Sequence, residues 1–478
     1  MGERFLSVFP ITVYMDESIL EAARKIGRDR NIPVEVKKIG NSHYLYRSTT
    51  KWDKEKKKRV KVSEYLGRIN ESGLVEKNNR SIFEFGSSEL LMTMAWDLVP
   101  ELKRRFPDHW KEIVAISVVR AMDNQPLKLI KSRWEKLYAS RQIDASLSPN
   151  TLSEKIRIIG SDHDAQYRFF RSLINRDDFL LFDLSSIFSR SQNVNLAEKG
   201  YNHEHLNIDE IGFALIFSGK RHMPVILEPI PGSVRDMKAY DSIVDQYDLR
   251  RCIIVADRGL ASYDMPKRKG IFFIVAIKRN FKIIDYSMKL DKSFIYRDRG
   301  INSGKKHVEG KFLYMYEDAM MRAEEETNLI KKIQGGTRTQ KDLEDERPGL
   351  GKFSILSNMD DDPESIYGMY KMREEVEQAF DAMKNELEND KAYLHTTDGI
   401  RGYFFLSFIS LYIYFRILEM LKAKNMSPKV SVKEAILELS KIYAMVHGAR
   451  VSLAEIPEKS QNMSDLFELK LSPKILWN

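Results

Sequence analysis

The sequence predicts an α/β protein, from the helical and strand patterns that alternate along it. Its 478 residues exceed the usual size of one domain and predict about three domains. Residues 88–174 carry apolar side chains at helical spacing, in segments separated by Ser, Pro and Gly. From residue 179 to residue 277 the period changes, and short apolar runs bounded by turn residues predict five strands. Residues 366–387 return to a strongly amphipathic helical pattern. Helical and strand patterns alternating in one chain predict an α/β core.

The composition indicates a soluble globular protein, with 43% hydrophobic and 31% charged residues. A formal charge of +8 permits a polyanionic partner such as nucleic acid. The single cysteine, Cys252, excludes a disulfide framework and a thiolate metal site. The N-terminus lacks the apolar core of a signal peptide, and the apolar run 403–415 is too short to span a bilayer. We therefore expect a cytoplasmic protein without a membrane role.

The helix expected over residues 366–387 carries the most specific pattern in the chain. Asp360, Asp361, Asp362 and Pro363 precede it and supply an N-cap and an N1 proline. On an ideal helix one edge, within about 60°, presents Tyr370, Arg373, Glu377 and Lys384. The adjacent stripe, predicted to face the core, consists of Val376, Ala379, Phe380, Met383 and Leu387.

A carboxylate flanked by two cations suits a site that holds a metal ion and a phosphate together. The alternative is a solvated helix edge laced with ion pairs, which is the usual meaning of such a charge pattern. Glu374 and Asp381 lie near the same edge and are competing acids.

Two aspartates upstream accompany predicted strands. Asp183 interrupts FLLFDLSSIF, a run that is apolar on both faces, and a buried carboxylate there needs a partner or a metal because its desolvation is costly. Asp257 ends the apolar strand of RCIIVADRG, where ordinary turn chemistry is the alternative explanation.

These segments resemble the DDE transposases of prokaryotic insertion sequences, of the insertion-sequence-four group. The resemblance rests on the spacing Y-x2-R-x3-E-x6-K and on DLSS, GYNHEH, PGSVRD and VADRGL, and covers residues 180–415. It implies a ribonuclease H-like catalytic core interrupted by a largely β insertion. That core is preceded by a β-hairpin module and a helical DNA-binding region.

The resemblance also implies the chemistry of the site. Asp183, Asp257 and Glu377 would be the catalytic residues and would hold two Mg²⁺ or Mn²⁺ ions, while Tyr370, Arg373 and Lys384 would contact DNA. The implied partner is double-stranded DNA, both the terminal inverted repeats of the element and the target, bound by a homodimer. The alternatives are a DNA-binding protein that no longer catalyses and a stand-alone ribonuclease H-like nuclease.

The expected domain organisation follows the changes in pattern. Residues 1–80 form a basic β module, 81–175 a helical region that binds DNA, 176–280 and 358–422 the two parts of the core, 281–357 the insertion, and 423–478 a helical tail. The β module contains a strand, a turn rich in Lys between residues 51 and 61, and a second strand. This hairpin is either a phosphate-contacting arm or a solvated loop.

Several smaller features carry their own expectations. In the insertion we expect strands at 294–297, 311–316 and 352–356, a helix at 317–333 and a loop at 337–351. Residues 431–446 are expected to be helical, and the chain ends in a short tail. His203, Glu204 and His205 have the residue types of a metal site, but His-x-His in a loop without further ligands is usually surface.

Overall fold

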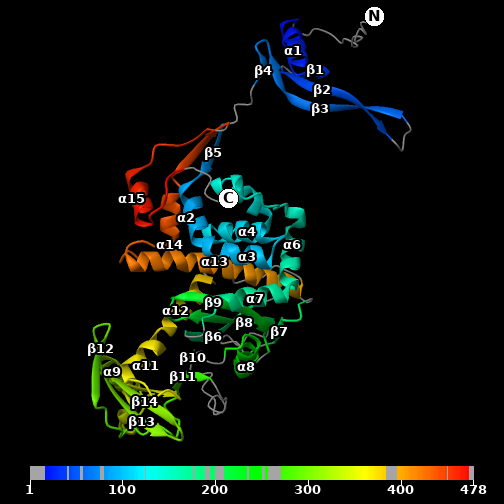
Figure 1. Cartoon of the computed structure of the whole chain (residues 1–478). Helices are drawn as coiled ribbons and strands as arrows, with labels where there is room; N and C mark the ends of the chain where they lie inside the picture. The colour runs from blue at the N-terminus through cyan, green and yellow to red at the C-terminus, as the bar shows by residue number, and fades with distance from the viewer. Residues whose placement is uncertain are drawn as a thin grey trace, which may run out of the picture. The chain divides into compact units, whose positions relative to one another are not determined.

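The computed structural model of the chain is shown in Figure 1. It describes residues 17–39, 42–53, 58–75, 80–123, 125–175, 178–188, 194–199, 209–233, 236–249, 253–256, 271–383, 396–448 and 450–472. The chain divides into two compact units. Unit 1 consists of Met1–Ile82 and Ala444–Leu453, and unit 2 of Phe83–Tyr443 and Ala454–Asn478.

Unit 1 contains a four-stranded antiparallel sheet with one helix packed on it. The sheet order is β1-β2-β3-β4, and its strands are β1 (Val34–Ile39), β2 (Ser42–Asp53), β3 (Lys58–Asn70) and β4 (Gly73–Val75). Helix α1 (Glu17–Asp29) buries Ile19 and Ala23 against Leu45 and Ile69 of the sheet. The predicted hairpin is confirmed as β2 and β3, whereas α1 was not predicted.

The predicted helix over residues 431–446 is wrong in its second half. Helix α14 (Val432–Leu439) ends at Leu439, and the chain continues as strands β16 (Tyr443–His447) and β17 (Arg450–Leu453). These pair with each other and with β5 (Arg80–Glu84) in the order β17-β16-β5. Alternate residues of β16 are buried, the period-two pattern of a strand. The final tail contains helix α15 (Glu458–Leu466), which was not predicted.

The helical part of unit 2 surrounds one long buried helix. The helices before the sheet are α2 (Gly86–Ala95), α3 (Val99–Arg105), α4 (Trp110–Met122), α5 (Ile130–Trp134), α6 (Pro149–Ser161) and α7 (His163–Leu173). Helix α13 (Thr397–Ala423) contacts α2, α4, α6 and α14. In the described part of the chain, α13 alone is long and apolar enough to cross a membrane, but 72% of its most apolar window is buried inside the protein. It is a core helix of unit 2.

The crossing of α6 and α13 depends on two glycines. A Cβ atom at Gly160 would lie 1.7 Å from the carbonyl oxygen of Asp398, and one at Gly402 would lie 2.0 Å from that of Ile156. Neither distance is possible between real atoms, so only glycine lets the two backbones approach this closely. The neighbouring atoms are backbone and cannot move aside as a flexible side chain would.

The core sheet of unit 2 contains all five strands that the sequence predicted between residues 179 and 277. They are β6 (Phe179–Phe188), β8 (Asp209–Ser218), β9 (Met223–Pro231), β10 (Ile253–Ala256) and β11 (Phe272–Ile277). They are ordered β9-β8-β6-β10-β11, with β8 antiparallel to its neighbours and β10 parallel to both β6 and β11. The two-residue strand β7 (Glu198–Lys199) also pairs with β8, and α8 (Asp236–Gln246) follows β9. Strand β6 is therefore the central one of these five strands.

The predicted insertion extends this sheet. Its strands are β12 (Lys292–Tyr296), β13 (Arg299–Val308), β14 (Lys311–Asp318) and β15 (Lys352–Ser357), and its main helix is α9 (Ala319–Gln334). Strand β15 pairs with β11, so the sheet continues without a break from the core into the insertion. The expected loop over 337–351 is wrong, because Thr339 and Asp342 form a capping box that begins helix α10 (Gln340–Glu346). Strand β13 was not predicted.

The glycine crossing gives a stability prediction. We expect Gly160→Ala and Gly402→Ala each to lower the free energy of unfolding by about 1–3 kcal/mol or more, because the added methyl group separates α6 from α13. Gly368→Ala is the matched control: it also lies in a helix, but a Cβ there meets nothing within 4 Å. That change should raise stability by up to about 1 kcal/mol. Urea unfolding of the three variants tests the prediction, and equal effects would contradict it.

Candidate active site

Asp183 occupies the middle of the central strand. It pairs with Leu215 of β8 and follows Leu181, which pairs with Val255 of β10. Its side chain is 22% exposed, and one carboxylate oxygen accepts a hydrogen bond from the backbone N–H of Leu184 at 3.0 Å. The predicted apolar strand interrupted by one half-buried carboxylate is confirmed.

Two consecutive helices replace the single predicted helix. Asp362 caps α11 (Pro363–Lys371) by accepting a hydrogen bond from the backbone N–H of Glu364, as expected, and Pro363 occupies the first turn. The chain turns at Met372 and continues as α12 (Arg373–Asp381). The described part of the predicted helix ends at Met383.

Helix α12 is fixed against the sheet by the predicted apolar stripe. Val376, Ala379 and Met383 are fully buried, and α12 contacts β6 and β8. The ring of Phe380 meets that of Phe213 of β8 at a centroid distance of 5.7 Å. Because Phe213 is two residues from the partner of Asp183 along β8, α12 covers the face of the sheet that carries Asp183.

Arg373 and Asp183 come together across a separation of 190 residues. The Nη2 atom of Arg373 lies 3.4 Å from Oδ2 of Asp183, and the arginine side chain is only 10% exposed. The guanidinium carbon also lies 5.9 Å from the ring centroid of Tyr370. The structure therefore places three of the predicted site residues together. The pairing crosses from helix to sheet and differs from the solvated helix edge that was the alternative.

The acids on α12 differ in what holds them. Glu374 forms an ion pair with Arg297, which follows β12, and Glu375 accepts a hydrogen bond from His222 Nδ1 at 2.7 Å. Glu377 is exposed and, within the described residues, makes no hydrogen bond or ion pair. The competing acid Glu374 is thus engaged with Arg297 of the insertion, whereas the side chain of Glu377 is open to solvent.

The other predicted site residues lie outside the described part of the chain. Asp257 directly follows β10, which ends at Ala256, and Lys384 directly follows the described helix. The same holds for the GYNHEH segment, with His203, Glu204 and His205. Among the described residues no group of three His, Cys, Asp or Glu side chains is arranged to hold a metal ion. The metal set of Asp183, Asp257 and Glu377 remains a prediction.

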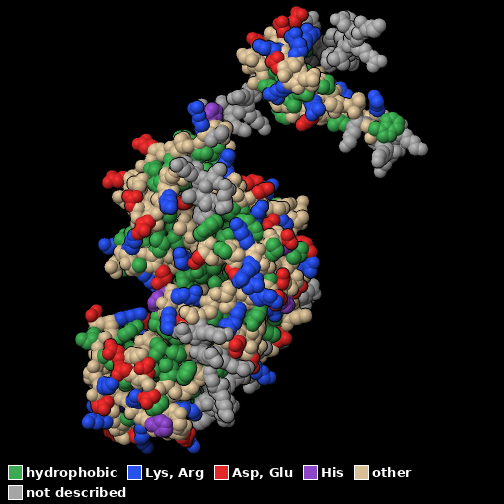
Figure 2. Space-filling view, viewed as in Figure 1, with side chains coloured by type: hydrophobic (Ala, Val, Ile, Leu, Met, Phe, Trp, Pro, Cys, Tyr) green, Lys and Arg blue, Asp and Glu red, His purple; other side chains and the backbone are tan. Residues whose placement is uncertain are grey.

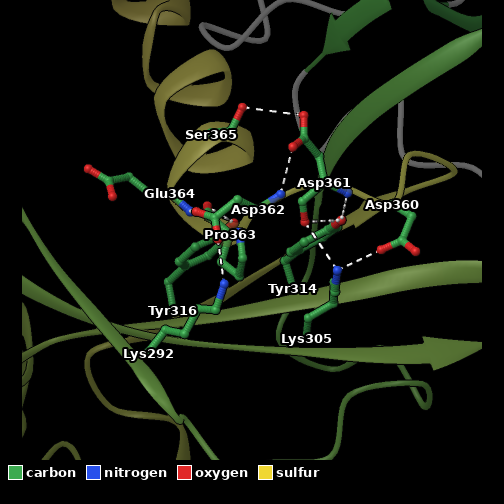
Figure 3. Close-up of polar contacts among 10 residues, drawn as sticks. All are labelled: Lys292, Lys305, Tyr314, Tyr316, Asp360, Asp361, Asp362, Pro363, Glu364 and Ser365. Carbon is green, nitrogen blue, oxygen red and sulfur yellow. Dashed lines mark hydrogen bonds and ion pairs between the residues drawn. The ribbon is translucent and has the colours of Figure 1, made fainter.

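The three aspartates before α11 do not form an open acidic cluster. Asp360, Asp361 and Asp362 contact residues of the insertion, and Asp362 also caps the helix. Figure 3 shows Lys305 directed at Asp360 and Lys292 at Asp362, both from the insertion strands. The Tyr314 hydroxyl donates to the carbonyl oxygen of Met359 at 2.8 Å and accepts from the N–H of Asp361 at 3.0 Å. The expected capping role of this segment is confirmed.

One contact at the site was not anticipated from the sequence. His222 lies in the turn between β8 and β9 at a positive φ of 55°, and its hydrogen bond ties that turn to α12 through Glu375. This hydrogen bond raises the pKa of His222 above its ordinary value of 6.5. No signal in the sequence predicts the pair, because the partners are 153 residues apart and neither is a specified position of a motif.

Residues 185–413 match the family described as "Transposase DDE domain". The matched segment begins just after Asp183 and includes Asp257, Glu377 and the strands and helices around them. It supports a function in DNA transposition. Among solved structures, the chain is similar to a piggyBac transposase synaptic complex with hairpin DNA, determined by cryo-electron microscopy. The identity is 12% and the TM-score 0.40, over 74% of this chain and 77% of that chain. Comparison with curated proteins gave no match.

The His222–Glu375 pair predicts a pH-dependent attachment of α12 within the DDE-matching segment. Because the pKa of His222 is raised in the folded protein, its stabilising contribution is complete below pH 6.5 and is lost as the pH rises through the raised value. We expect α12 amides to exchange with deuterium faster above that range, after correction for intrinsic exchange. In His222→Ala the exchange should be fast at both pH values. Equal pH dependence in the variant would assign the effect to another group.

Proposed function

We propose that the protein is a transposase that cleaves and joins DNA at the inverted-repeat ends of its own insertion sequence. The ion pair between Arg373 and Asp183 carries this proposal. Asp183 comes from the first acidic segment of the resemblance and Arg373 from the Y-x2-R-x3-E-x6-K segment. Two motifs identified separately in the sequence meet at one point on the central strand, which is what a shared active site requires.

The sheet topology supports a ribonuclease H-like core. Numbered in chain order, its five strands lie in the order 3-2-1-4-5, with only the second antiparallel to its neighbours. Leu181 and Val255 pair on adjacent parallel strands, and each precedes one of the two aspartates by two residues. This register supports Asp183 and Asp257 as a pair of acids at one edge of the site. The intact Y-R-E-K spacing supports the insertion-sequence-four group.

The residues fit a divalent metal centre by their chemistry. Asp183, Asp257 and Glu377 offer only hard oxygen donors, which Mg²⁺ and Mn²⁺ prefer, and Asp183 is half-buried beside a cation that offsets its charge. These three carboxylates would hold two ions. When bound, such ions supply activation of an attacking water or 3′-hydroxyl and stabilisation of the leaving oxygen.

The remaining residues act on the phosphate and on the acids. Arg373 holds Asp183 in place, and its charge reduces the repulsion between carboxylates and phosphate. Lys384, Arg373 and Tyr370 would contact the phosphate near the cleaved end, the first two as positive charges and the third as a hydrogen-bond donor. The substrate is double-stranded DNA, bound by a homodimer in the cytoplasm of a prokaryote.

Replacing either aspartate tests whether its carboxylate is needed for DNA cleavage rather than for DNA binding. We expect Asp183→Asn and Asp257→Asn each to abolish Mg²⁺-dependent cleavage and joining of DNA flanking the gene. Binding should persist, since it draws on phosphate contacts spread over the surface. Cleavage gels and fluorescence polarisation on the same duplexes measure both. If binding fell in proportion to activity, the aspartates would be holding the fold rather than catalysing.

The charges of the Y-x2-R-x3-E-x6-K segment can be tested through the salt dependence of DNA binding. We expect Lys384→Ala and Arg373→Ala to reduce the slope of log affinity against log salt by about one unit per lost phosphate contact. Glu377→Gln should lower cleavage without weakening affinity, because it removes a negative charge beside DNA. Arg373→Ala needs a thermal-unfolding control, because it also leaves the half-buried carboxylate of Asp183 without its positively charged partner. Three unchanged slopes with full cleavage would contradict the assignment.

A further inference from the structure

The hairpin of unit 1 continues beyond the rest of its sheet. Strand β1 pairs with β2 only over residues 42–47, and β4 pairs with β3 only over residues 68–70. Apart from the hydrogen bond from the Ser48 N–H to the carbonyl oxygen of Pro33 at 3.0 Å, the backbones of β2 and β3 pair only with each other from the pair Ser48–Ser63 to the pair Asp53–Lys58. We call these residues, 48–53 and 58–63, the ribbon. Six residues a strand give it a length of about 20 Å.

The two faces of the hairpin differ in what covers them. Leu45, the other odd-numbered residues of β2 and their cross-strand partners lie on the face where α1 packs. The opposite face, which we call the tyrosine face, carries the residues of even number on β2 and their partners. It consists of Tyr44, Tyr46, Ser48, Thr50 and Trp52 on β2, Arg59, Lys61, Ser63, Tyr65 and Arg68 on β3, and Glu35, Lys37 and Ile39 on β1.

Aromatic side chains are exposed on the tyrosine face. Tyr65 is 47% exposed and Trp52 is 58% exposed, although burial of such rings is normally favourable. The ring of Tyr65 contacts those of Tyr44 and Tyr46 at centroid distances of 6.1 and 5.4 Å, so the three tyrosines form one cluster. Figure 2 shows hydrophobic and basic side chains, together with some acidic ones, at the surface of unit 1. Exposed aromatic groups of this kind mark an interaction surface.

The charge of the tyrosine face is positive. It carries four cations, Lys37, Arg59, Lys61 and Arg68, against the single acid Glu35. Lys61 forms an ion pair with Glu35 at 2.7 Å, and the Nζ atom of Lys37 lies 4.5 Å from the ring centroid of Tyr46. Within the described residues Arg59 and Arg68 make no ion pair. The partner must therefore supply negative charge.

We propose that the tyrosine face binds double-stranded DNA, with the ribbon inserted in the major groove. A two-stranded β-ribbon fits that groove, which is about 12 Å wide. The ribbon section presents Ser48, Ser63 and Thr50 together with Arg59 and Lys61, which are side chains that read base edges. The tyrosine cluster and Arg68, nearer the body of the sheet, contact sugar and phosphate. The choice of DNA rests on the proposed function, but the face that binds it is derived from unit 1 alone.

The test compares neighbouring residues on opposite faces of the ribbon. Arg59 lies on the tyrosine face and Lys58 on the other, so Arg59→Gln and Lys58→Gln each remove one positive charge at the same end of the ribbon. Thr50→Val and Thr49→Val form a second matched pair, each replacing a hydroxyl by a methyl group. The full-length protein is titrated by fluorescence polarisation, without metal, on short duplexes tiling the DNA beside its gene and on a random-sequence duplex.

We expect Arg59→Gln to weaken binding to the preferred duplex about tenfold and Lys58→Gln less than about twofold. Thr50→Val should narrow the preference for that duplex over random sequence, whereas Thr49→Val should leave it unchanged. Equal effects within each pair, or tighter binding of the single strand than of the duplex, would overturn the proposal. Cleavage and binding that survive Arg59→Gln unchanged would contradict this inference alone. Face-specific binding by a protein that never cleaves would contradict the transposase proposal alone.

Discussion

The carboxylate of Asp183 sets a constraint that much of unit 2 meets. A charge in the middle of a central strand would cost several kcal/mol if it were buried without a partner. The backbone N–H of Leu184 supplies one hydrogen bond, and Arg373 supplies the opposite charge. That arginine reaches the strand only because α12 lies against β6. The sheet can therefore accommodate the charge of Asp183 only while α12 keeps its position. An apolar residue at 183 would remove the need for this arrangement, so the stability of the fold does not account for an acid at this position.

The position of α12 is in turn fixed from three sides. Its buried stripe of Val376, Ala379 and Met383 packs on the core, His222 holds Glu375 from the turn after β8, and Arg297 holds Glu374 from the insertion. The insertion can contribute because β15 pairs with β11 and thus belongs to the same sheet as the site. Its lysines also neutralise the aspartates before α11, as Figure 3 shows. The insertion therefore helps to hold α11 and α12 in position, a role that could not be predicted from its charged sequence.

The sequence predicted those elements whose pattern reflects burial. The strand around Asp183 and the stripe of α12 were found because a residue buried on the core must be apolar at the period of its element. Helix α10 was missed although the Thr339 to Asp342 capping box was present, because the segment buries little beyond Leu343 and has no apolar period. Strand β16 was assigned to a helix because its alternation lasts only five residues. The pairs Arg373–Asp183 and His222–Glu375 join distant residues, and only the fold brings them together.

The two units differ in how far their positive charges are balanced by acids, a difference that the total charge of +8 does not show. In unit 2 many cations are matched to acids of the same chain, as in Arg279 with Glu325 and Arg401 with Glu228, and Figure 2 shows both signs interspersed over the visible surface. Such pairs leave little field to attract a polyanion. On the tyrosine face of unit 1, four cations face one acid. If the tyrosine face binds DNA as proposed, the affinity for the duplex resides in unit 1 and the carboxylates that repel phosphate lie in unit 2. The proposed site would then keep its acids without weakening the binding of its substrate.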